Sequence, residues 1–227
     1  MKYWTIIPAA GIGVRIQADR PKQYLMLNNE PILSRVINLF SSLPEIEKVV
    51  VVLNSQDHWW STLSLSHPEK VLTAIGGQER VHSVLLGLQF LQDFADKNDF
   101  VLVHDAARPC VQVKQIQRLI AELHDHAVGG LFGLPVVDTL KKVDDDNNVL
   151  ATVSRHQLWQ AQTPQLFRYG LLKNAIEQSL LKNKIVTDES SAVEQFGLTP
   201  KMILGDVRNL KITYVEDLKN AAVYFIS

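Results

Sequence analysis

The sequence has very few of the residues that mark secreted and membrane proteins. Of its 227 residues only Cys110 is a cysteine, so no disulfide forms within the chain and a reducing compartment is the natural interpretation. No apolar run approaches the roughly 18 residues that a membrane span needs. The apolar stretch near the N-terminus is too short for the hydrophobic region of a secretory signal. We therefore expect a cytoplasmic protein with no membrane partner.

An excess of charge of either sign is also missing. Lys and Arg number 23 against 24 Asp and Glu, which gives a net charge of −1. A protein that coats nucleic acid relies on surplus positive charge, so we expect no nucleic-acid partner. A small anionic ligand needs only a local cluster of cations and fits this balance. With 46% hydrophobic and 21% charged residues, the chain is typical of a packed globular protein.

Familiar catalytic and metal-binding patterns are absent as well. The sequence contains no HExxH, no CxxC and no grouping of Ser, His and Asp that resembles a catalytic triad. Its seven histidines are scattered, which argues against a metal held by imidazoles. The acidic run 144–146 is interpreted as turn chemistry, because its side chains would point into solvent.

Short apolar runs alternate with amphipathic stretches along the chain. Runs at 48–54, 100–109 and 129–137 predict buried strands, and the first contains four consecutive valines. Apolar residues at helical spacing predict helices over 32–43, 81–94 and 113–126. The alternation predicts an α/β fold, with a mostly parallel sheet and helices on both faces. In such a sheet ligands bind beyond the carboxyl ends of the strands.

Two later segments depart from this alternation. Residues 135–155 predict a β-hairpin around a turn of Asp and Asn at 144–148. Such a hairpin is either an arm exchanged between protomers or a solvated edge, and the residues alone leave both readings open. Residues 201–226 predict a strand, a polar loop, a short strand and a C-terminal helix that Glu216 and Asp217 open.

A glycine loop follows the first predicted strand. Gly11 and Gly13 remove side chains where a backbone can approach a ligand and point its N–H groups at an anion. The dinucleotide fingerprint would need a third glycine where Ile16 stands, and no Gly-Lys-Ser/Thr of a Walker A loop occurs. A GxG turn alone is weak evidence. Arg15 and Lys22, seven residues apart, favour a polyphosphate whose charge must be neutralised during reaction.

Two more segments carry residues suited to the same chemistry. In GGQERVHSV, residues 76–84, a helix begins near Arg80 and its N-terminus favours an anion or a base edge. Asp105 ends a hydrophobic strand and is either a Mg²⁺ ligand or a capping residue. Arg108 lies at the same rim and could meet a second anion. Together these features predict nucleotidyl transfer, which needs positioning and charge stabilisation rather than a covalent nucleophile.

Eight segments then resemble one family, in order and across nearly the whole chain. They are PAAGIGVR, PKQY, GGQERVHSV, VHDAARP, PVVDTLK, QAQTPQLF, TDESSAVE and NLKITYVEDL. As an ordered set they resemble the 2-C-methyl-D-erythritol 4-phosphate cytidylyltransferases of the non-mevalonate route to isoprenoid precursors. The resemblance implies a Rossmann-like nucleotidyltransferase fold, with residues 1–227 as one domain and a dimerisation arm at about 135–157.

The resemblance also implies an activity and its partners. CTP and methylerythritol phosphate would give the CDP-alcohol and pyrophosphate, with Mg²⁺ or another divalent cation, in a homodimer joined through the arm. By position, Arg15 and Lys22 would stabilise the transition state, and Asp105 would bind the metal. The implied CTP-binding residues are Pro8, Ala9, Ala10, Gly11, Gly13, Gly77, Gln78, Ser83, Asp105, Ala106 and Lys211. The implied acceptor-binding residues are Arg108, Asp138, Arg155, Thr163 and Thr187, with Arg155 coming from the partner's arm.

Some positions depart from the family pattern or allow a second interpretation. Arg208 stands where an acid is frequent, so a second metal carboxylate would have to come from Asp206. Gln78 stands where the family often has Asp. Thr187 begins a segment that also reads as a helix N-cap with acids after it. Residues 162–165 read as a rigid loop.

Three rival functions remain to be compared with this prediction. The same fold would serve a cytidylyltransferase for another polyol phosphate, such as ribitol 5-phosphate. A silent nucleotide-binding protein would have no need for the paired cations Arg15 and Lys22. A dinucleotide-dependent oxidoreductase lacks support, because the third glycine is missing and Asn54 stands where an acid would end the second strand.

Overall fold

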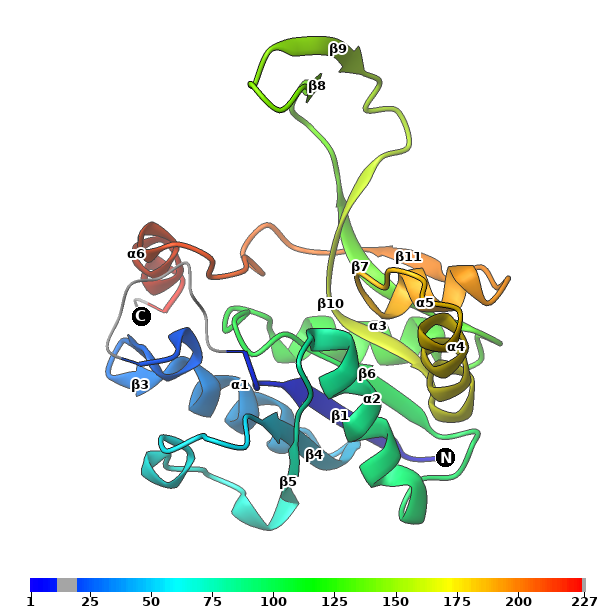
Figure 1. The fold of residues 1–227 in the computed structure, drawn as a ribbon. Helices are drawn as coiled ribbons and strands as arrows, with labels where there is room; N and C mark the ends of the chain where they lie inside the picture. The colour runs from blue at the N-terminus through cyan, green and yellow to red at the C-terminus, as the bar shows by residue number, and fades with distance from the viewer. Residues whose placement is uncertain (12–19, 226–227) are drawn as a thin grey trace.

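The structure is a computed structural model that describes residues 1–11 and 20–225 (Figure 1). A seven-stranded sheet runs through it in the order β11-β7-β10-β6-β1-β4-β5. Its strands are β1 (Tyr3–Pro8), β4 (Ile46–Leu53), β5 (Val71–Ile75), β6 (Phe100–Val103), β7 (Gly129–Pro135), β10 (Trp159–Arg168) and β11 (Lys201–Leu204). Among the described residues no helix is long and apolar enough to cross a membrane.

The sheet is mostly parallel, as predicted. Strand β10 runs antiparallel to both β6 and β7, whereas the pairs β1–β4, β1–β6, β4–β5 and β11–β7 are parallel. The chain builds outward from β1 to β4 and β5, then returns to place β6 on the other side of β1. The strand order therefore reverses at the carboxyl ends of β1 and β6, which is where α/β sheets form ligand crevices.

Helices cover both faces of the sheet, which confirms the predicted architecture (Figure 1). Helices α1 (Ile32–Ser41) and α3 (Val113–Leu123) pack on one face, and α2 (Arg80–Phe90), α4 (Tyr169–Leu181) and α5 (Glu189–Gln195) pack on the other. In β4, Val49 and Val51 face the first layer, while Val50 and Val52 face the second. The run of valines is continuous because a sheet covered on both sides has no polar face.

Smaller elements complete the body. The hairpin β2 (Met26–Leu27) and β3 (Glu30–Pro31) turns through Asn28 and Asn29, whose φ angles are 47° and 64°; asparagine tolerates this left-handed region well. The 3-10 helices are η1 (Lys22–Tyr24), η2 (Trp60–Thr62), η3 (Pro68–Lys70) and η4 (Leu91–Asp93). Helix α6 (Val215–Val223) contributes Ala221 to a third small core with Cys110 and Ile212.

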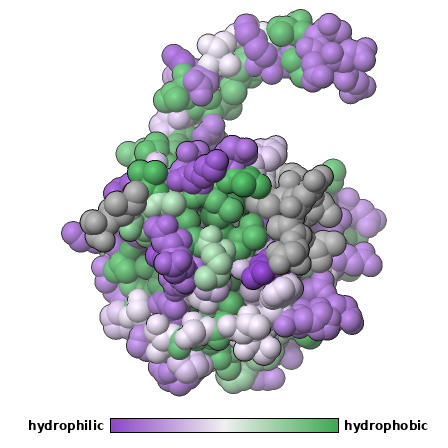
Figure 2. Space-filling view, turned by 90° about the vertical axis from the view of Figure 1, so that its left-hand side faces the viewer, coloured by the Kyte–Doolittle hydropathy of each residue, from purple (hydrophilic) through white to green (hydrophobic). Residues whose placement is uncertain are grey.

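The predicted hairpin is present and projects from the ends of β7 and β10 (Figure 1). It consists of β8 (Leu140–Val143) and β9 (Val149–Val153), and every residue of β9 is exposed. The Asp144 carboxylate accepts the backbone N–H groups of Asp146 and Asn148, which closes the predicted turn. We call residues 136–158 the arm, and Figure 2 shows it standing clear of the body with apolar and hydrophilic groups along it.

Three local expectations are wrong. Residues 162–165, predicted as a loop, lie within β10 at a shift in its register with β7. Helix α5 is capped by Asp188, whose side chain accepts the Ser191 N–H, and not by Thr187. Residues 205–214 form no strand, because their backbone groups are bonded by side chains instead: Gln162 and Arg108 donate to the carbonyl oxygen of Asn209.

Candidate active site

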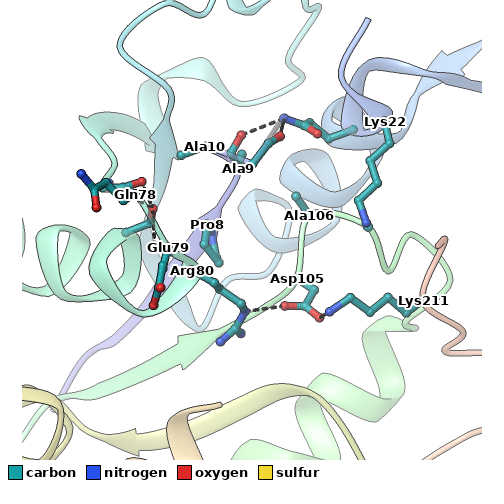
Figure 3. A pocket seen from close by; sticks show the side chains of 15 residues that line it. Pro8, Ala9, Ala10, Lys22, Gln78, Glu79, Arg80, Asp105, Ala106 and Lys211 are labelled. Atoms are coloured by element: carbon teal, nitrogen blue, oxygen red, sulfur yellow. Dashed lines mark hydrogen bonds and ion pairs between the residues drawn. The ribbon is translucent and has the colours of Figure 1, made fainter. Parts of the chain in front are cut away.

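A cavity of about 320 Å³ lies beyond the carboxyl ends of β1 and β6, beside the start of α2 (Figure 3). Its volume is within the range of small-molecule sites. The described residues that line it are Pro8, Ala9, Ala10, Gly11, Lys22, Gln23, Gly77, Gln78, Glu79, Arg80, Ser83, Asp105, Ala106, Ala107 and Lys211. The described members of the predicted CTP-binding set therefore come together in one place, and Lys22 joins them. Gly13 and Arg15 lie outside the described residues.

Close packing of two loops gives the cavity its glycine-rich wall. A Cβ atom on Gly76 would stand 2.5 Å from the Ala10 Cβ and 2.8 Å from the Ser83 Oγ. The Gly77 N–H also donates to the Ser83 Oγ at 3.2 Å. Glycine is required at position 76 because the first loop, the second loop and α2 leave no room there for a side chain. Ser83 thus shapes the wall from one turn inside the helix.

Asp105 is the electrostatic centre of the cavity (Figure 3). Its carboxylate lies 2.9 Å from the Arg80 Nε, 2.8 Å from the Lys211 Nζ and 3.6 Å from the Arg108 Nε. Burial alone would raise the pKa of this carboxyl, but the cations, Arg80 first, hold it well below its usual range. Asp105 is therefore ionised, and three positive groups are gathered around one negative charge.

The loop after β6 is fixed from beneath by a buried hydrogen-bond chain. The Asp105 N–H donates to the Thr163 Oγ1 at 3.0 Å, so the Thr163 hydroxyl proton is free to point at the His104 Nδ1, 3.1 Å away. Burial lowers the pKa of His104 to about 4, which keeps its ring neutral. The remaining ring N–H then donates from Nε2 to the Arg108 carbonyl oxygen at 3.0 Å. Thr163 thereby holds the backbone of Asp105 in place.

Sequence reasoning missed two residues that organise the cavity. The Gln23 amide donates to the carbonyl oxygens of Ala9 at 2.8 Å and Gly11 at 3.1 Å, which ties η1 to the glycine loop. Arg80 joins Asp105 to Glu189, with Nη1–Oε1 at 2.6 Å and Nη2–Oε2 at 3.1 Å. Both residues stand inside the quoted motifs PKQY and GGQERVHSV, which was the only signal for them.

Lys22 and Lys211 approach the cavity from elements far apart in the sequence. Lys22 begins η1, and its Nζ donates to the Ile212 carbonyl oxygen at 3.2 Å. Lys211 is the neighbour of that carbonyl and pairs with Asp105. The two ammonium groups therefore line the same side of the cavity (Figure 3).

The predicted acceptor-binding residues separate into two groups. Arg108 and Thr163 contact Asp105 or its backbone, and Thr187 is an exposed residue just before α5. Asp138 and Arg155 are exposed on the arm and do not line the cavity. The Arg155 guanidinium donates to the Val137 carbonyl oxygen, across the stem of the arm.

The donor groups present suit a divalent cation only together with a ligand's own oxygens. Residues 1–11 and 20–225 hold no group of three or more His, Cys, Asp or Glu side chains that could bind a metal. Asp206 is held by Arg208, with Nη2–Oδ2 at 2.6 Å and Nε–Oδ1 at 3.0 Å. Asp105 and Glu79 are therefore the carboxylates that line the cavity, and the buried Asp105 fits Mg²⁺, an ion that combines one or two carboxylates with phosphate oxygens.

Comparison with known proteins gives a consistent result. The family model described as 2-C-methyl-D-erythritol 4-phosphate cytidylyltransferase matches residues 3–227. A protein of that name from Dechloromonas aromatica is 46% identical over 224 residues, 98% of this chain and 96% of the relative. One from Hahella chejuensis is 43% identical over 223 residues, 98% of this chain and 92% of the relative.

The crystal structure of the Francisella tularensis protein of the same name superposes with a TM-score of 0.87 at 37% identity. The superposition covers 99% of this chain and 100% of the Francisella tularensis chain. The likeness thus extends from the loops of the cavity to the arm.

Proposed function

The chain belongs to the 2-C-methyl-D-erythritol 4-phosphate cytidylyltransferase family, and from that premise we propose how its cavity works. The enzyme transfers CMP from CTP to 2-C-methyl-D-erythritol 4-phosphate, giving 4-diphosphocytidyl-2-C-methyl-D-erythritol and pyrophosphate. It is a nucleotidyltransferase of the non-mevalonate isoprenoid pathway. The observation that carries the assignment to this cavity is the gathering of Arg80, Arg108 and Lys211 around Asp105 at the strand switch point.

In this reaction an oxygen of the acceptor phosphate forms a bond to the α-phosphorus of CTP while the bond to the β-phosphate oxygen breaks. The protein has to align the two phosphates and stabilise the charge that grows on the α-phosphate and on the leaving pyrophosphate. We assign the charge stabilisation to Lys22 with Arg15. Lys22 is supported by its position on the cavity wall, and Arg15 by its place in the matched motif.

The bare backbone of the first loop suits the triphosphate. Side chains are absent or minimal from Ala9 to Gly11, so backbone N–H groups can approach phosphate oxygens. The segment of Gly77, Gln78 and Ser83 lines the cavity between the end of β5 and the first turn of α2, and it suits the cytosine base. Lys211 is supported as a phosphate contact because its ammonium already lies beside Asp105.

We propose a divalent cation, Mg²⁺ or a similar ion, at Asp105. The ionised carboxylate supplies one ligand, and oxygens of the triphosphate supply others. When bound, the cation neutralises part of the triphosphate charge. Asp105 would hold the cation, and Lys211, whose ammonium lies 2.8 Å from that carboxylate, would be within reach of the phosphates.

We further propose that residues 1–227 form one nucleotidyltransferase domain that dimerises through the arm. The arm exposes large apolar side chains that the body does not cover, among them Val149 at 62% and Leu150 at 59% exposure, and a contiguous set of such residues is typical of an interface. Asp138 and Arg155 lie on the arm and not in their own chain's cavity. We expect them to reach the acceptor in the partner's cavity.

A cytoplasmic location without nucleic-acid partners is part of the same proposal. The single cysteine is buried and unpaired, as expected in a reducing compartment. The net charge of −1 gives no field that would attract a nucleic acid.

The direct test is pyrophosphate release with CTP and Mg²⁺ in three parallel reactions: methylerythritol phosphate, ribitol 5-phosphate, and no acceptor. We expect release with methylerythritol phosphate alone. Release with ribitol 5-phosphate alone would keep the mechanism and replace the acceptor. CTP binding without release in any reaction would contradict the enzymatic assignment and support a silent nucleotide-binding protein.

A further inference from the structure

An ion pair behind the cavity wall links the first residues of two helices, α2 and α5. Arg80 is the first residue of α2 and Glu189 is the first residue of α5. Two guanidinium nitrogens of Arg80 face both oxygens of Glu189, at 2.6 and 3.1 Å, while its Nε faces the Asp105 Oδ1 at 2.9 Å. One planar group therefore bridges a carboxylate in the cavity and a carboxylate behind it.

The two carboxylates differ in their surroundings. Asp105 lines the cavity, whereas Glu189 is 1% exposed and does not line it. The position of Glu189 is itself fixed by Gln165 of β10. The Gln165 amide oxygen accepts the Ser190 N–H at 2.8 Å, and its amide nitrogen donates to the Asp188 Oδ2 at 2.8 Å. Glu189 is thus anchored to the central sheet and is rigid relative to β6.

This geometry constrains how Arg80 can turn. A guanidinium has five N–H donors in one plane, and a carboxylate that grips it at two points fixes the orientation of the plane. With Glu189 in place, Arg80 offers only its Nε edge to Asp105. Without that grip, the same guanidinium could pair with Asp105 at two points or turn toward a bound triphosphate. Either rearrangement would move the carboxylate or a phosphate away from the reacting geometry.

We propose that Glu189 is a positioning residue for nucleotidyl transfer, which holds Arg80 in the single orientation that leaves the Asp105 Oδ2 facing the cavity. The inference rests on the proposed function of the cavity. Glu189 contacts neither nucleotide nor acceptor in this scheme and acts through Arg80. The Asp105 Oδ2 stays available to Lys211 or to a bound cation.

Stability alone gives a weak reason for such a pair. Replacing a buried ion pair with apolar residues of similar volume is often neutral or stabilising. A pair that only held α2 against α5 could therefore be exchanged for Met and Leu with little effect on turnover. A pair that positions Asp105 could not be exchanged in this way without loss of turnover, because the apolar residues would leave Asp105 without its fixed partner. This difference separates the two roles experimentally.

The experiment compares three variants with the full-length enzyme. Glu189→Gln keeps the shape and removes the charge, and Arg80→Met/Glu189→Leu replaces the pair with apolar side chains. The matched control Arg35→Met/Glu30→Leu removes another ion pair, 3.0 Å long and partly buried, whose residues do not line the cavity. For each protein we would measure Tm, CTP affinity by calorimetry, and kcat and KM with saturating acceptor.

We expect Glu189→Gln and the apolar pair each to lower kcat by roughly 10- to 100-fold, the scale of misplacing a reacting group by about 1 Å. The KM for CTP should change less than threefold in Glu189→Gln, since one more net positive charge does not weaken triphosphate binding. The apolar pair should keep the wild-type Tm within a few degrees, and the control should keep wild-type kcat.

Wild-type kcat in a folded Glu189→Gln protein, or in the apolar double variant, would overturn the proposal and leave the pair a structural contact. If Glu189→Gln does not fold, wild-type kcat in the double variant still overturns the proposal, and a 10- to 100-fold loss supports a positioning role for the Arg80–Glu189 pair as a unit. Failure of the proposed function looks different, because the unmodified enzyme would then release no pyrophosphate with any acceptor.

Discussion

The cavity and the arm are built from opposite kinds of contact. Around the cavity, the charged side chains of Asp105, Arg80 and Arg108 are 9%, 29% and 11% exposed, and each meets an opposite charge. Asp105 has three cationic neighbours. Along β9 every residue is exposed, and the arm is held by its own ladder and the turn at Asp144. The described residues of the cavity contact one another, whereas the side chains of the arm mostly face solvent.

This difference teaches which part of the reaction each region can support. The groups assigned to CTP are held by hydrogen bonds that join β1, η1, α2 and β6, so the nucleotide site is pre-organised in one chain. The arm presents Arg155 and Asp138 to solvent, away from the residues that line its own chain's cavity. Mutations in the two regions should therefore separate chemistry and nucleotide binding from acceptor binding.

The largest expected effect comes from the cavity. Lys22→Ala should lower kcat by roughly 10²- to 10³-fold, the range seen when one group that stabilises transition-state charge is removed. Its charge acts mainly on the transition state, so CTP should still bind with nearly wild-type affinity. The measurements are pyrophosphate release and calorimetric titration with CTP.

Lys114→Ala on α3 is the matched control, because Lys114 is exposed and lies outside the cavity lining. It should behave as the unmodified enzyme does. Near-wild-type kcat in Lys22→Ala would remove Lys22 from the chemistry and leave it a surface cation.

The arm should show the complementary pattern. Arg155→Ala should raise the KM for the acceptor phosphate by roughly 10- to 100-fold, the value of one charged hydrogen bond. The KM for CTP should stay within twofold, and the protein should still elute as a dimer, because one guanidinium contributes little to the apolar contacts of the arm. Steady-state kinetics with each substrate varied, together with size-exclusion chromatography, test this expectation.

Lys141→Ala removes another exposed cation of the same arm, one that hydrogen-bonds to Thr152 on the neighbouring strand, and should leave both KM values unchanged. A monomeric enzyme in which Arg155→Ala has no effect on the acceptor KM would contradict the idea that the arm serves a partner.

Much of the fold could be predicted, because its signals are local. The four valines of β4 are apolar on both faces, and the turn at 144–148 has the side chains that close a hairpin. The failures involve partners distant in sequence. Residues 162–165 contain a proline, which usually argues against a strand, yet the register shift accommodates it in β10. Residues 209–214 alternate like a strand, but side chains bind several of their backbone groups. Gln162 and Arg108 donate to the Asn209 carbonyl oxygen, and the Asp217 carboxylate accepts the N–H groups of Thr213 and Tyr214.

The cavity-lining residues could be predicted to the extent that they stand in short motifs. Gly77 and Asp105 each lie two residues past the end of an apolar strand, in the motifs GGQERVHSV and VHDAARP, and their neighbours in the chain reveal them. Glu189 is 109 residues from Arg80, and no local pattern relates the two. Gln23 looks like any polar residue until its amide is seen to bond the carbonyl oxygens of the first loop. A positioning role depends on distances that the sequence does not contain.

The smallest expected effect is on stability and its dependence on pH, and it is tested by comparing one aspartate of the body, Asp99, with one of the arm, Asp144. Asp99 accepts the N–H groups of Lys2 and Asp96 and the Trp4 Nε1–H; burial would raise its pKa, but these bonds hold it below the usual range. Hydrogen bonds, mainly from Asn148, also lower the pKa of Asp144, in the turn at the tip of the arm.

A carboxyl whose pKa is lower in the folded state adds stability above its unfolded pKa, about 3.9, and loses it as the pH falls through the folded value. The Tm of the unmodified protein should therefore drop between about pH 5 and pH 3. Asp99→Asn should lower the free energy of unfolding at pH 7 by the worth of a buried charged hydrogen bond, roughly 1–3 kcal/mol, with a corresponding fall in Tm, and make the Tm profile flatter in that interval. Asp144→Asn should leave both nearly unchanged, since water replaces what an exposed turn loses. Equal flattening in the two variants would mean that the arm is as tightly coupled to the fold as the body is.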